Sequence, residues 1–291
     1  MNFDLGPDEL ALRDGIRELC VRRFPIERVR AEGFTRDGWK VLGDAGVFSL
    51  RLPEDQGGAG LGMTEAVIVF EELGRALIPG PLVASHLAAG SVERGTVVSL
   101  WDGHLIEFPE EADRALSGGE VLDVPNAERI EALDPLTPIG RTESEAPASN
   151  DQLEGVALTA ALLSGIASKT VELAVGYAKE REQFGKPIGT FQAVKHMCAD
   201  SLVRAEVARA AVDAAGVLLD AGDADSTRAV HAAKLLAGEY AVQNAKTCVQ
   251  VYGGMGFTWE VDVHLYLKRA AVLSTQFGGT EAQAELLAAS L

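Results

Sequence analysis

The sequence predicts a mainly α-helical protein with a small β domain in the middle of the chain. Apolar residues recur at helical spacing through residues 1–90 and again through residues 151–291. Residues 91–150 differ, because short β-branched runs alternate there with acidic, proline-rich and serine-rich stretches. We therefore expect an N-terminal helical domain over 1–90, a shortened middle β domain and linker over 91–150, and a C-terminal antiparallel helix bundle over 151–291.

Length and charge narrow the class of protein. A chain of 291 residues can bury a large core and form two or three domains. Its 43 acidic and 26 basic residues give a net charge of −17, which argues against binding to nucleic acid or anionic membranes. The N-terminal sequence MNFDLGPDEL lacks the features of a secretion signal, and we expect no apolar run long enough to span a bilayer. We expect a cytoplasmic protein.

The cysteines predict neither disulfides nor a metal site. Cys20, Cys198 and Cys248 are odd in number and lie in segments with helical patterns. This usage is typical of buried free thiols in a reducing compartment. Histidines and cysteines do not cluster at the spacing of metal ligands, so no metal is expected.

The N-terminal region is expected to form helices over Asp8–Phe24, Gly38–Phe48, Met63–Ala76 and Leu82–Gly90. Thr64 is a suitable N-cap residue, because its side-chain oxygen can accept a hydrogen bond from an amide of the first turn. The third helix should therefore begin near Glu65. The glycine-rich stretch 52–62 before it is a loop by composition.

The middle region is expected to form strands over Thr96–Trp101 and Leu105–Phe108, with weaker candidates at Glu120–Val124 and Arg129–Leu133. Trp101 is expected in the core of this small sheet. Thr142–Asn150 is expected to be an exposed linker. The C-terminal region should form helices over Leu158–Arg181, Phe191–Leu219, Ser226–Tyr252, Val261–Leu273 and Glu281–Leu291.

The break between the first two C-terminal helices has an unusual composition. Gly185, Pro187 and Gly189 interrupt the helical pattern. A simple connection does not need the arginine, phenylalanine and glutamine residues that surround these three. Arg181 presents a planar and permanently charged group that suits a phosphate ligand.

Two motifs in this part of the chain resemble those of the acyl-CoA dehydrogenase family. The first has the form R-x-x-F-G-x-x-x-x-x-F-Q, and the second is Gln250-Val-Tyr-Gly-Gly-Met-Gly-Phe257. The loop P-E-x-x-G-G-x-G-L and the helix E-E-L-G-R in the N-terminal region also match the family. The resemblance implies FAD-dependent dehydrogenation, in which a carboxylate removes an α-proton from an acyl-CoA thioester and FAD accepts the β-hydride.

The resemblance also implies which residues contact the cofactor. In the family, these motifs reach across a dimer interface to the pyrophosphate and adenosine of FAD that the neighbouring subunit mainly binds. The matching residues here are Arg181, Gln183, Phe184, Gln192, Gln250, Gly253 and Gly254. The glycines would let the backbone approach a phosphate closely. The alternative is that the motifs persist as fold architecture without FAD.

Other parts of the family pattern are missing. The family's middle domain is about twice as long and carries a T-E-P-x-x-G-S-D segment against the flavin, which this chain lacks. Its base lies in a Y-E-G-T segment, where this chain has Phe-Gly-Gly-Thr with Gly278 at the position of the acid. A second branch places the base at the position of Gly155, so the adjacent Glu154 is a candidate. Glu281 would point elsewhere, and Glu260 is expected to have a structural or interface role.

This combination is similar to the actinobacterial dehydrogenases for steroid side-chain thioesters, which are heterotetramers of two different subunits. Gly256–Glu260 and His264–Arg269 match that subgroup's version of the second motif. The first hypothesis is therefore a subunit that completes the FAD site of a partner carrying the base. The alternatives are a self-sufficient homo-oligomeric dehydrogenase that uses Glu154 or another acid, and a non-catalytic scaffold or binding protein.

Overall fold

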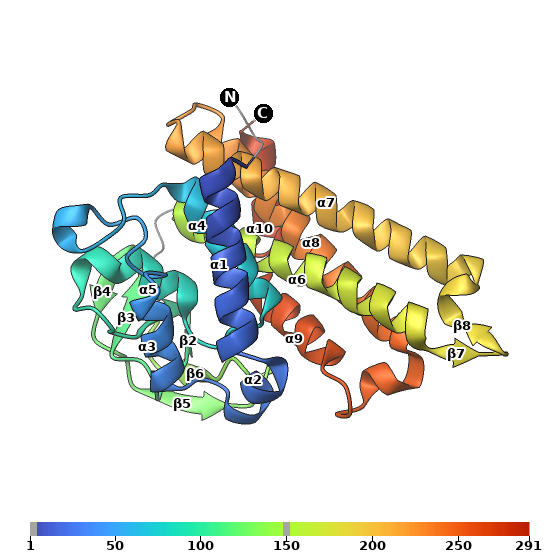
Figure 1. Cartoon of the computed structure of the whole chain (residues 1–291). Helices are drawn as coiled ribbons and strands as arrows, with labels where there is room; N and C mark the ends of the chain where they lie inside the picture. Colours follow the sequence, from blue (N-terminus) through green and yellow to red (C-terminus); the bar gives the residue numbers. More distant parts are fainter. Residues whose placement is uncertain (1–4, 148–151, 291) are drawn as a thin grey trace.

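Helices at both ends of the chain flank a small sheet, as a computed structural model of residues 5–147 and 152–290 shows (Figure 1). The sheet lies at one side of the molecule, and a short hairpin projects from the bundle at the opposite side. The predicted fold class is confirmed. The division at residues 90 and 150 stays a prediction, and residue 150 itself lies outside the described part of the chain.

The N-terminal helices are α1 (Pro7–Arg23), α2 (Ile26–Glu32), α3 (Arg36–Asp44), α4 (Met63–Arg75) and α5 (Leu82–Ala88). The bounds expected for α1 and α5 agree closely with these. Helix α3 begins earlier than predicted, because the side chain of Thr35 accepts a hydrogen bond from the Gly38 amide at 3.1 Å. Helix α2 has only 7 residues and was not predicted, since so short a segment shows little periodicity.

The prediction that Thr64 caps α4 is wrong. Helix α4 starts at Met63, and the Thr64 hydroxyl donates a hydrogen bond to Asp220 at 2.7 Å. The Asp220 carboxylate also accepts from the Met63 and Thr64 amides, at 2.6 and 2.8 Å. The cap therefore comes from another helix, and Gly62 leaves room for it, since a Cβ there would lie 2.6 Å from the carboxylate.

The sheet has six strands in the order β4-β3-β1-β2-β6-β5, and all neighbours are antiparallel except β1 and β3. The strands are β1 (Val98–Asp102), β2 (Leu105–Glu107), β3 (Arg114–Ser117), β4 (Glu120–Leu122), β5 (Ala127–Ile130) and β6 (Ile139–Thr142). Strands β3 and β6 were not predicted, and β5 lies nearer the N-terminus than Arg129–Leu133.

Trp101 is buried in the sheet as predicted, and its indole donates to the Thr142 hydroxyl at 3.3 Å. The expectation that the exposed linker begins at Thr142 is wrong, because Thr142 is a buried residue of β6. Residues 148–150 of that predicted linker lie outside the described residues. Cys20 and Cys248 are buried free thiols as expected, whereas Cys198 is half-buried.

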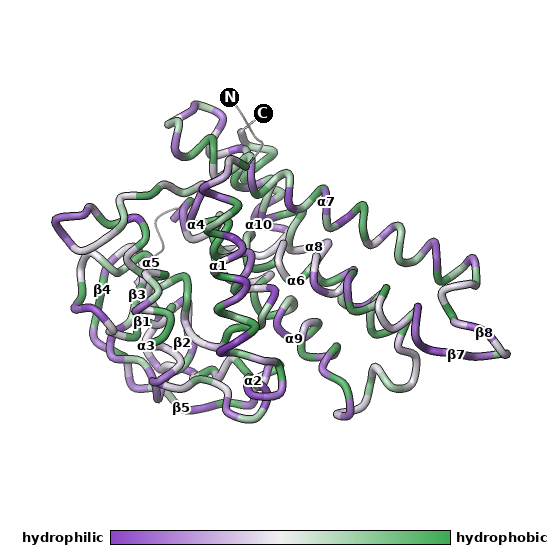
Figure 2. Tube along the Cα trace, in the orientation of Figure 1, coloured by the Kyte–Doolittle hydropathy of each residue, from purple (hydrophilic) through white to green (hydrophobic). Residues whose placement is uncertain are grey.

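The bundle consists of α6 (Leu153–Glu180), α7 (Gln192–Asp220), α8 (Ser226–Tyr252), α9 (Val263–Leu273) and α10 (Thr280–Ala289). Along α7, hydrophilic and hydrophobic residues alternate from turn to turn, as expected for a helix with one face on the bundle (Figure 2). The expectation that no apolar run is long enough to span a bilayer is wrong for α6, which is long and apolar enough by composition, but 78% of its most apolar window is buried in the protein. Its hydrophobicity therefore belongs to the core.

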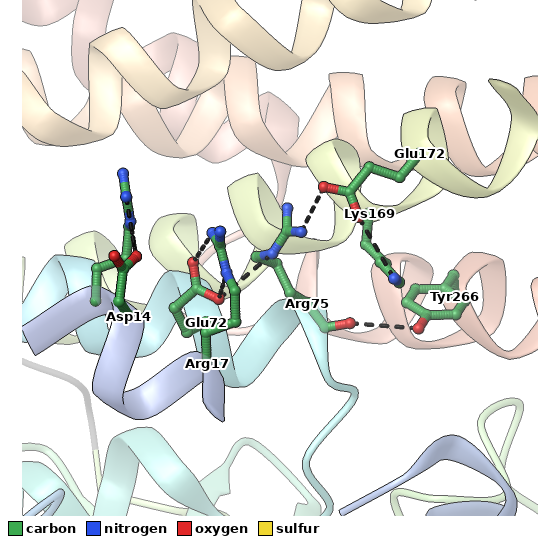
Figure 3. Close-up of polar contacts among 8 residues, drawn as sticks. Asp14, Arg17, Glu72, Arg75, Lys169, Glu172 and Tyr266 are labelled. Carbon is green, nitrogen blue, oxygen red and sulfur yellow. Dashed lines mark hydrogen bonds and ion pairs between the residues drawn. The ribbon is translucent and has the colours of Figure 1, made fainter. Parts of the chain in front are cut away.

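Close packing and ion pairs join the N-terminal helices to the bundle. A Cβ on Gly165 of α6 would lie 2.0 Å from the Glu71 carbonyl of α4, so α4 and α6 cross with their backbones almost in contact. Beside this crossing, Arg17 of α1 binds the buried Glu72 of α4, and Arg75 binds Glu172 of α6 at 2.5 Å (Figure 3). This row of charges fixes three helices relative to one another.

Candidate functional site

The two family motifs lie at the same end of the bundle, although 57 residues lie between Gln192, where the first ends, and Gln250, where the second begins. A hairpin of β7 (Glu182–Gln183) and β8 (Lys186–Pro187) connects α6 to α7, and α8 ends near it (Figure 1). The rings of Tyr177 in α6 and Tyr252 in α8 stack 3.9 Å apart at 14°. Ile188 and Val249 also belong to one hydrophobic cluster at this end. The two motifs thus form a single surface.

The tip of the hairpin exposes an aromatic side chain. Phe184 and Gly185 both have positive φ angles, of 55° and 76°, which turn the chain between the two short strands. Phe184 is 90% exposed, and the centroid of its ring lies 6.0 Å from that of Phe191, with the two rings edge to face at 85°. A large apolar side chain held this far into solvent is typical of a contact with another molecule.

The polar motif residues are also directed to solvent. Arg181 follows the last turn of α6 and is exposed, as are Gln192 and Gln250. In residues 5–147 and 152–290 no hydrogen bond or ion pair engages these three side chains. Gln183 donates a hydrogen bond to the carbonyl of its neighbour Glu182 at 2.8 Å. One permanent cation and two amide groups are therefore available for a ligand.

The two motif glycines have different roles. Gly253 ends α8 with a φ angle of 64°, a conformation that favours glycine. A Cβ on Gly254 would meet no atom within 4 Å, so nothing in the described chain requires glycine at this position. Bare backbone of this kind, at the same end of the bundle as the exposed Arg181, fits a phosphate group that approaches from outside the chain. The residues present thus fit the pyrophosphate part of FAD.

The two possible positions of the base converge in space. Gly155 lies in the first turn of α6, and Gly278 lies in the turn between α9 and α10. A Cβ on Gly155 would be 2.5 Å from the ring of Phe277, the residue before Gly278. Gly278 has a φ angle of 89°, and a Cβ there would be 2.8 Å from the Gln283 amide nitrogen. Neither position carries a carboxylate, and neither has room for one without rearrangement.

Glu154 is held in an ion pair. The Arg51 guanidinium donates to both of its carboxylate oxygens, at 2.6 and 2.7 Å. This pairing holds the pKa of Glu154 below its ordinary value. A general base works best when its pKa lies near the operating pH, so the contact with Arg51 favours a structural role for Glu154. Glu260 and Glu281 are both exposed.

A different carboxylate, Glu107, was not identified from the sequence. It lies on β2, where its side chain accepts hydrogen bonds from the Leu100 amide at 3.2 Å and from the Gln276 amide at 2.8 Å. Burial raises the pKa of Glu107 to about 7. It connects the sheet to the turn between α9 and α10. Strand alternation gives no signal for it, because its neighbours Ile106 and Phe108 are buried as well.

Comparison with known proteins agrees with this geometry. The chain matches the family models "Acyl-CoA dehydrogenase, N-terminal domain" over residues 6–96 and "Acyl-CoA dehydrogenase, C-terminal domain" over residues 154–291. It is 37% identical to acyl-CoA dehydrogenase FadE34 of Mycobacterium tuberculosis, over 84% of this chain and 41% of that protein. It therefore spans about two fifths of FadE34.

A second relative matches nearly end to end. Acyl-CoA dehydrogenase IpdE2 of M. tuberculosis is 33% identical over 89% of each chain. Among solved structures, a chain of the ChsE4-ChsE5 complex from M. tuberculosis has the same fold, with a TM-score of 0.86, 21% identity and coverage of 99% of this chain and 98% of that one. The chain therefore belongs to the acyl-CoA dehydrogenase family, whose members are FAD-binding oxidoreductases.

Proposed function

We propose that this chain is a subunit of a heteromeric acyl-CoA dehydrogenase and completes the FAD site of a partner subunit that carries the catalytic base. The reaction is the α,β-dehydrogenation of an acyl-CoA thioester, with steroid side-chain thioesters as the proposed substrate class. One observation carries the proposal. The chain presents a surface of exposed motif residues for FAD, while both positions of the base are glycines covered by Phe277 or Gln283.

The similar proteins support the partner in this proposal. The solved neighbour named above is a complex of two different chains, ChsE4 and ChsE5. Another neighbour is described as a steroid dehydrogenase made of Tcur3481 and Tcur3483. Since both are less than 25% identical to this chain, they support the fold directly and the heteromeric assembly only by analogy.

In such a complex, the motif surface would bind and orient FAD. FAD, when bound, accepts the hydride of the substrate. Arg181 would neutralise the pyrophosphate, and the backbone at Gly253 and Gly254 would approach it closely. The remaining motif side chains would contact the adenosine: Gln183, Phe184, Gln192 and Gln250. This chain thus contributes binding and orientation, and the partner contributes proton abstraction.

Arg181→Ala in the co-expressed complex tests the proposal. We expect a loss of flavin absorbance and of turnover while the two chains still co-purify, because the exposed side chain contributes little to the fold. Arg141→Ala is the matched control, since Arg141 is an exposed arginine of β6 at the opposite side of the molecule. Full FAD content and turnover in the isolated wild-type chain would exclude the proposal.

One observation favours a self-sufficient dehydrogenase as the second candidate. Glu107 is a buried carboxylate with a pKa of about 7, and it contacts the turn that carries the base in the family. If Glu107 were the base, Glu107→Gln would abolish turnover of the isolated chain and leave FAD bound. The scaffold alternative predicts instead that Arg181→Ala changes neither the FAD content nor the activity of any complex.

A further inference from the structure

Phe277 has an unusual backbone conformation for its residue type. Its φ angle is 53°, in the left-handed region that non-glycine residues avoid. Such strain persists only where the surrounding structure fixes it, and it often marks a functional position. The next residue, Gly278, also has a positive φ angle, so the turn between α9 and α10 places the Phe277 ring in one specific direction.

Buried polar side chains hold this turn in place. The Gln283 amide nitrogen donates to the Phe277 carbonyl at 2.8 Å. The side-chain oxygen of Gln283 lies 2.7 Å from the ring nitrogen of His231 in α8. Gln283 and His231 are each 1% exposed, so solvent does not compete for these hydrogen bonds.

Lys234 of α8 fixes the other side of the turn. Its ammonium group donates to the carbonyls of Ser274 and Gly278, at 3.0 and 3.2 Å. Lys234 is 2% exposed, and no carboxylate lies within ion-pair distance of it in the described part of the chain. A buried ammonium that binds only carbonyls is costly, and burial lowers the pKa of Lys234 to about 8. Fixing the turn in this way therefore costs the free energy of burying the Lys234 charge.

The Phe277 ring fills the space next to Gly155. Three atoms of the Phe277 ring lie 2.5, 2.8 and 2.9 Å from where a Cβ on Gly155 would be. The ring also forms part of the wall of a small cavity, whose lining combines Leu82 and Val83 of α5 and Leu162 of α6 with polar side chains that include Glu107 and Arg269. Phe277 is half-buried, so it lines this cavity, lies against Gly155 and remains partly accessible to solvent.

We propose that Phe277 is a fixed plug that excludes an acyl group from the space between α5, α6 and the α9–α10 turn of this chain. The ligand that it excludes is the acyl part of a CoA thioester. This inference rests on the proposed function for that ligand class and adds a reason why this subunit does not turn over substrate itself. Its own cavity is closed, in addition to lacking an acid at Gly155 and Gly278.

The test is the binding of butyryl-CoA to the full chain by calorimetry, for the wild type and for Phe277→Ala. We expect the variant to gain a saturable site, at least tenfold tighter than any binding by the wild type, and to bind free CoA no better than the wild type does. Phe108→Ala is the control, because Phe108 is another phenylalanine with a positive φ angle, of 47°, and does not line this cavity. It should gain no site.

Three results would overturn the plug: equal binding of butyryl-CoA by the wild type, no gain in a folded Phe277→Ala chain, or an equal gain for free CoA. If Phe277→Ala does not fold, Phe277→Leu is judged by the same criteria. A second measurement reads the contact itself, since Gly155→Ala should destabilise the wild type more than the Phe277→Ala chain. None of these measurements depends on FAD or on a partner, so a failure here is distinct from a failure of the Arg181 experiment.

Discussion

Arg51 binds both carboxylate oxygens of Glu154, and this contact separates the side chain from the role of a base. We expect Glu154→Gln to leave the FAD content and turnover of the complex unchanged, because the proposed function assigns removal of the α-proton to an acid of the partner subunit. The pair is partly exposed, with 45% of the Glu154 side chain accessible, so the unfolding free energy should fall by less than about 1 kcal/mol. Turnover and urea denaturation are the measurements.

Glu128→Gln is the control for this substitution, since Glu128 is an exposed residue of β5. It should match the wild type in both measurements. A loss of turnover with FAD still bound in Glu154→Gln, but not in Glu128→Gln, would make Glu154 the base and would support the self-sufficient dehydrogenase.

A fully buried ion pair joins α9 to the loop before β6. Asp134 is 0% exposed and binds Arg269, whose other nitrogens donate to the carbonyls of Ile78 and Leu136 at 3.0 and 3.2 Å. Arg269→Met should lower the unfolding free energy by about 3 to 5 kcal/mol, because it leaves a buried carboxylate without its cation. Urea denaturation of the purified chain measures this.

The double variant Arg269→Met with Asp134→Leu distinguishes charge from packing. Removing both charges eliminates the unpaired carboxylate, so we expect the double variant to recover part of the loss. A double variant as unstable as the sum of both single variants would mean that the hydrogen bonds to Ile78 and Leu136, rather than the charge pair, hold this junction.

Long helices with regular spacing were predictable from the sequence, whereas contacts between distant segments were not. The predicted bounds of α8, Ser226–Tyr252, agree with the structure because periodicity and the terminal Gly253 are local signals. The start of α4 was wrong because its cap, Asp220, comes from α7. Strand β6 was missed because a four-residue segment becomes a strand only by pairing with β2 and β5.

In the candidate site too, local features could be predicted from the sequence and long-range contacts could not. The motif residues could be found because each motif is a short local pattern in the sequence, and one of its backbone demands, the positive φ angle of Gly253, acts on the residue itself. The partners of Glu154 and Glu107 could not, because Arg51 is 103 and Gln276 is 169 residues away in the sequence. Which acid is paired and which is merely buried depends on these long-range contacts, and so does each pKa.

Glu107 should make stability depend on pH in a defined direction. Its pKa is about 7 in the folded chain, above the ordinary value, so the folded state binds the proton more tightly than the unfolded chain. The unfolding free energy should therefore rise as the pH falls from about 8 to about 5, by up to about 3 kcal/mol at about 1.4 kcal/mol per pKa unit. The unfolding free energy of Glu107→Gln should not show this rise as the pH falls, and at pH 8 it should exceed that of the wild type.

The comparison must be made between wild type and variant at each pH. Glu71 and Asp213, whose pKa values burial raises to about 7 and about 6, titrate in the same range and cancel in the difference. Asp123→Asn is the control, since Asp123 is an exposed acid next to β4. Equal pH dependence of Glu107→Gln and the wild type would show that Gln276 and Leu100 stabilise the anion enough to offset its burial.

Restoring the acid at Gly278 should not restore activity to the isolated chain. Gly278→Glu places a side chain on a residue with a φ angle of 89°, which costs roughly 1 to 2 kcal/mol for any residue other than glycine. Its Cβ would also lie 2.8 Å from the Gln283 nitrogen that binds the Phe277 carbonyl, so the turn must rearrange. We expect a lower melting temperature and no turnover.

Gly278→Ala is the control, and it should lower the melting temperature to a similar extent, because the strain arises from the Cβ. Turnover by Gly278→Glu without a partner would contradict both the proposed need for a partner subunit and the Phe277 plug, because the missing acid would then be the only deficit of this chain.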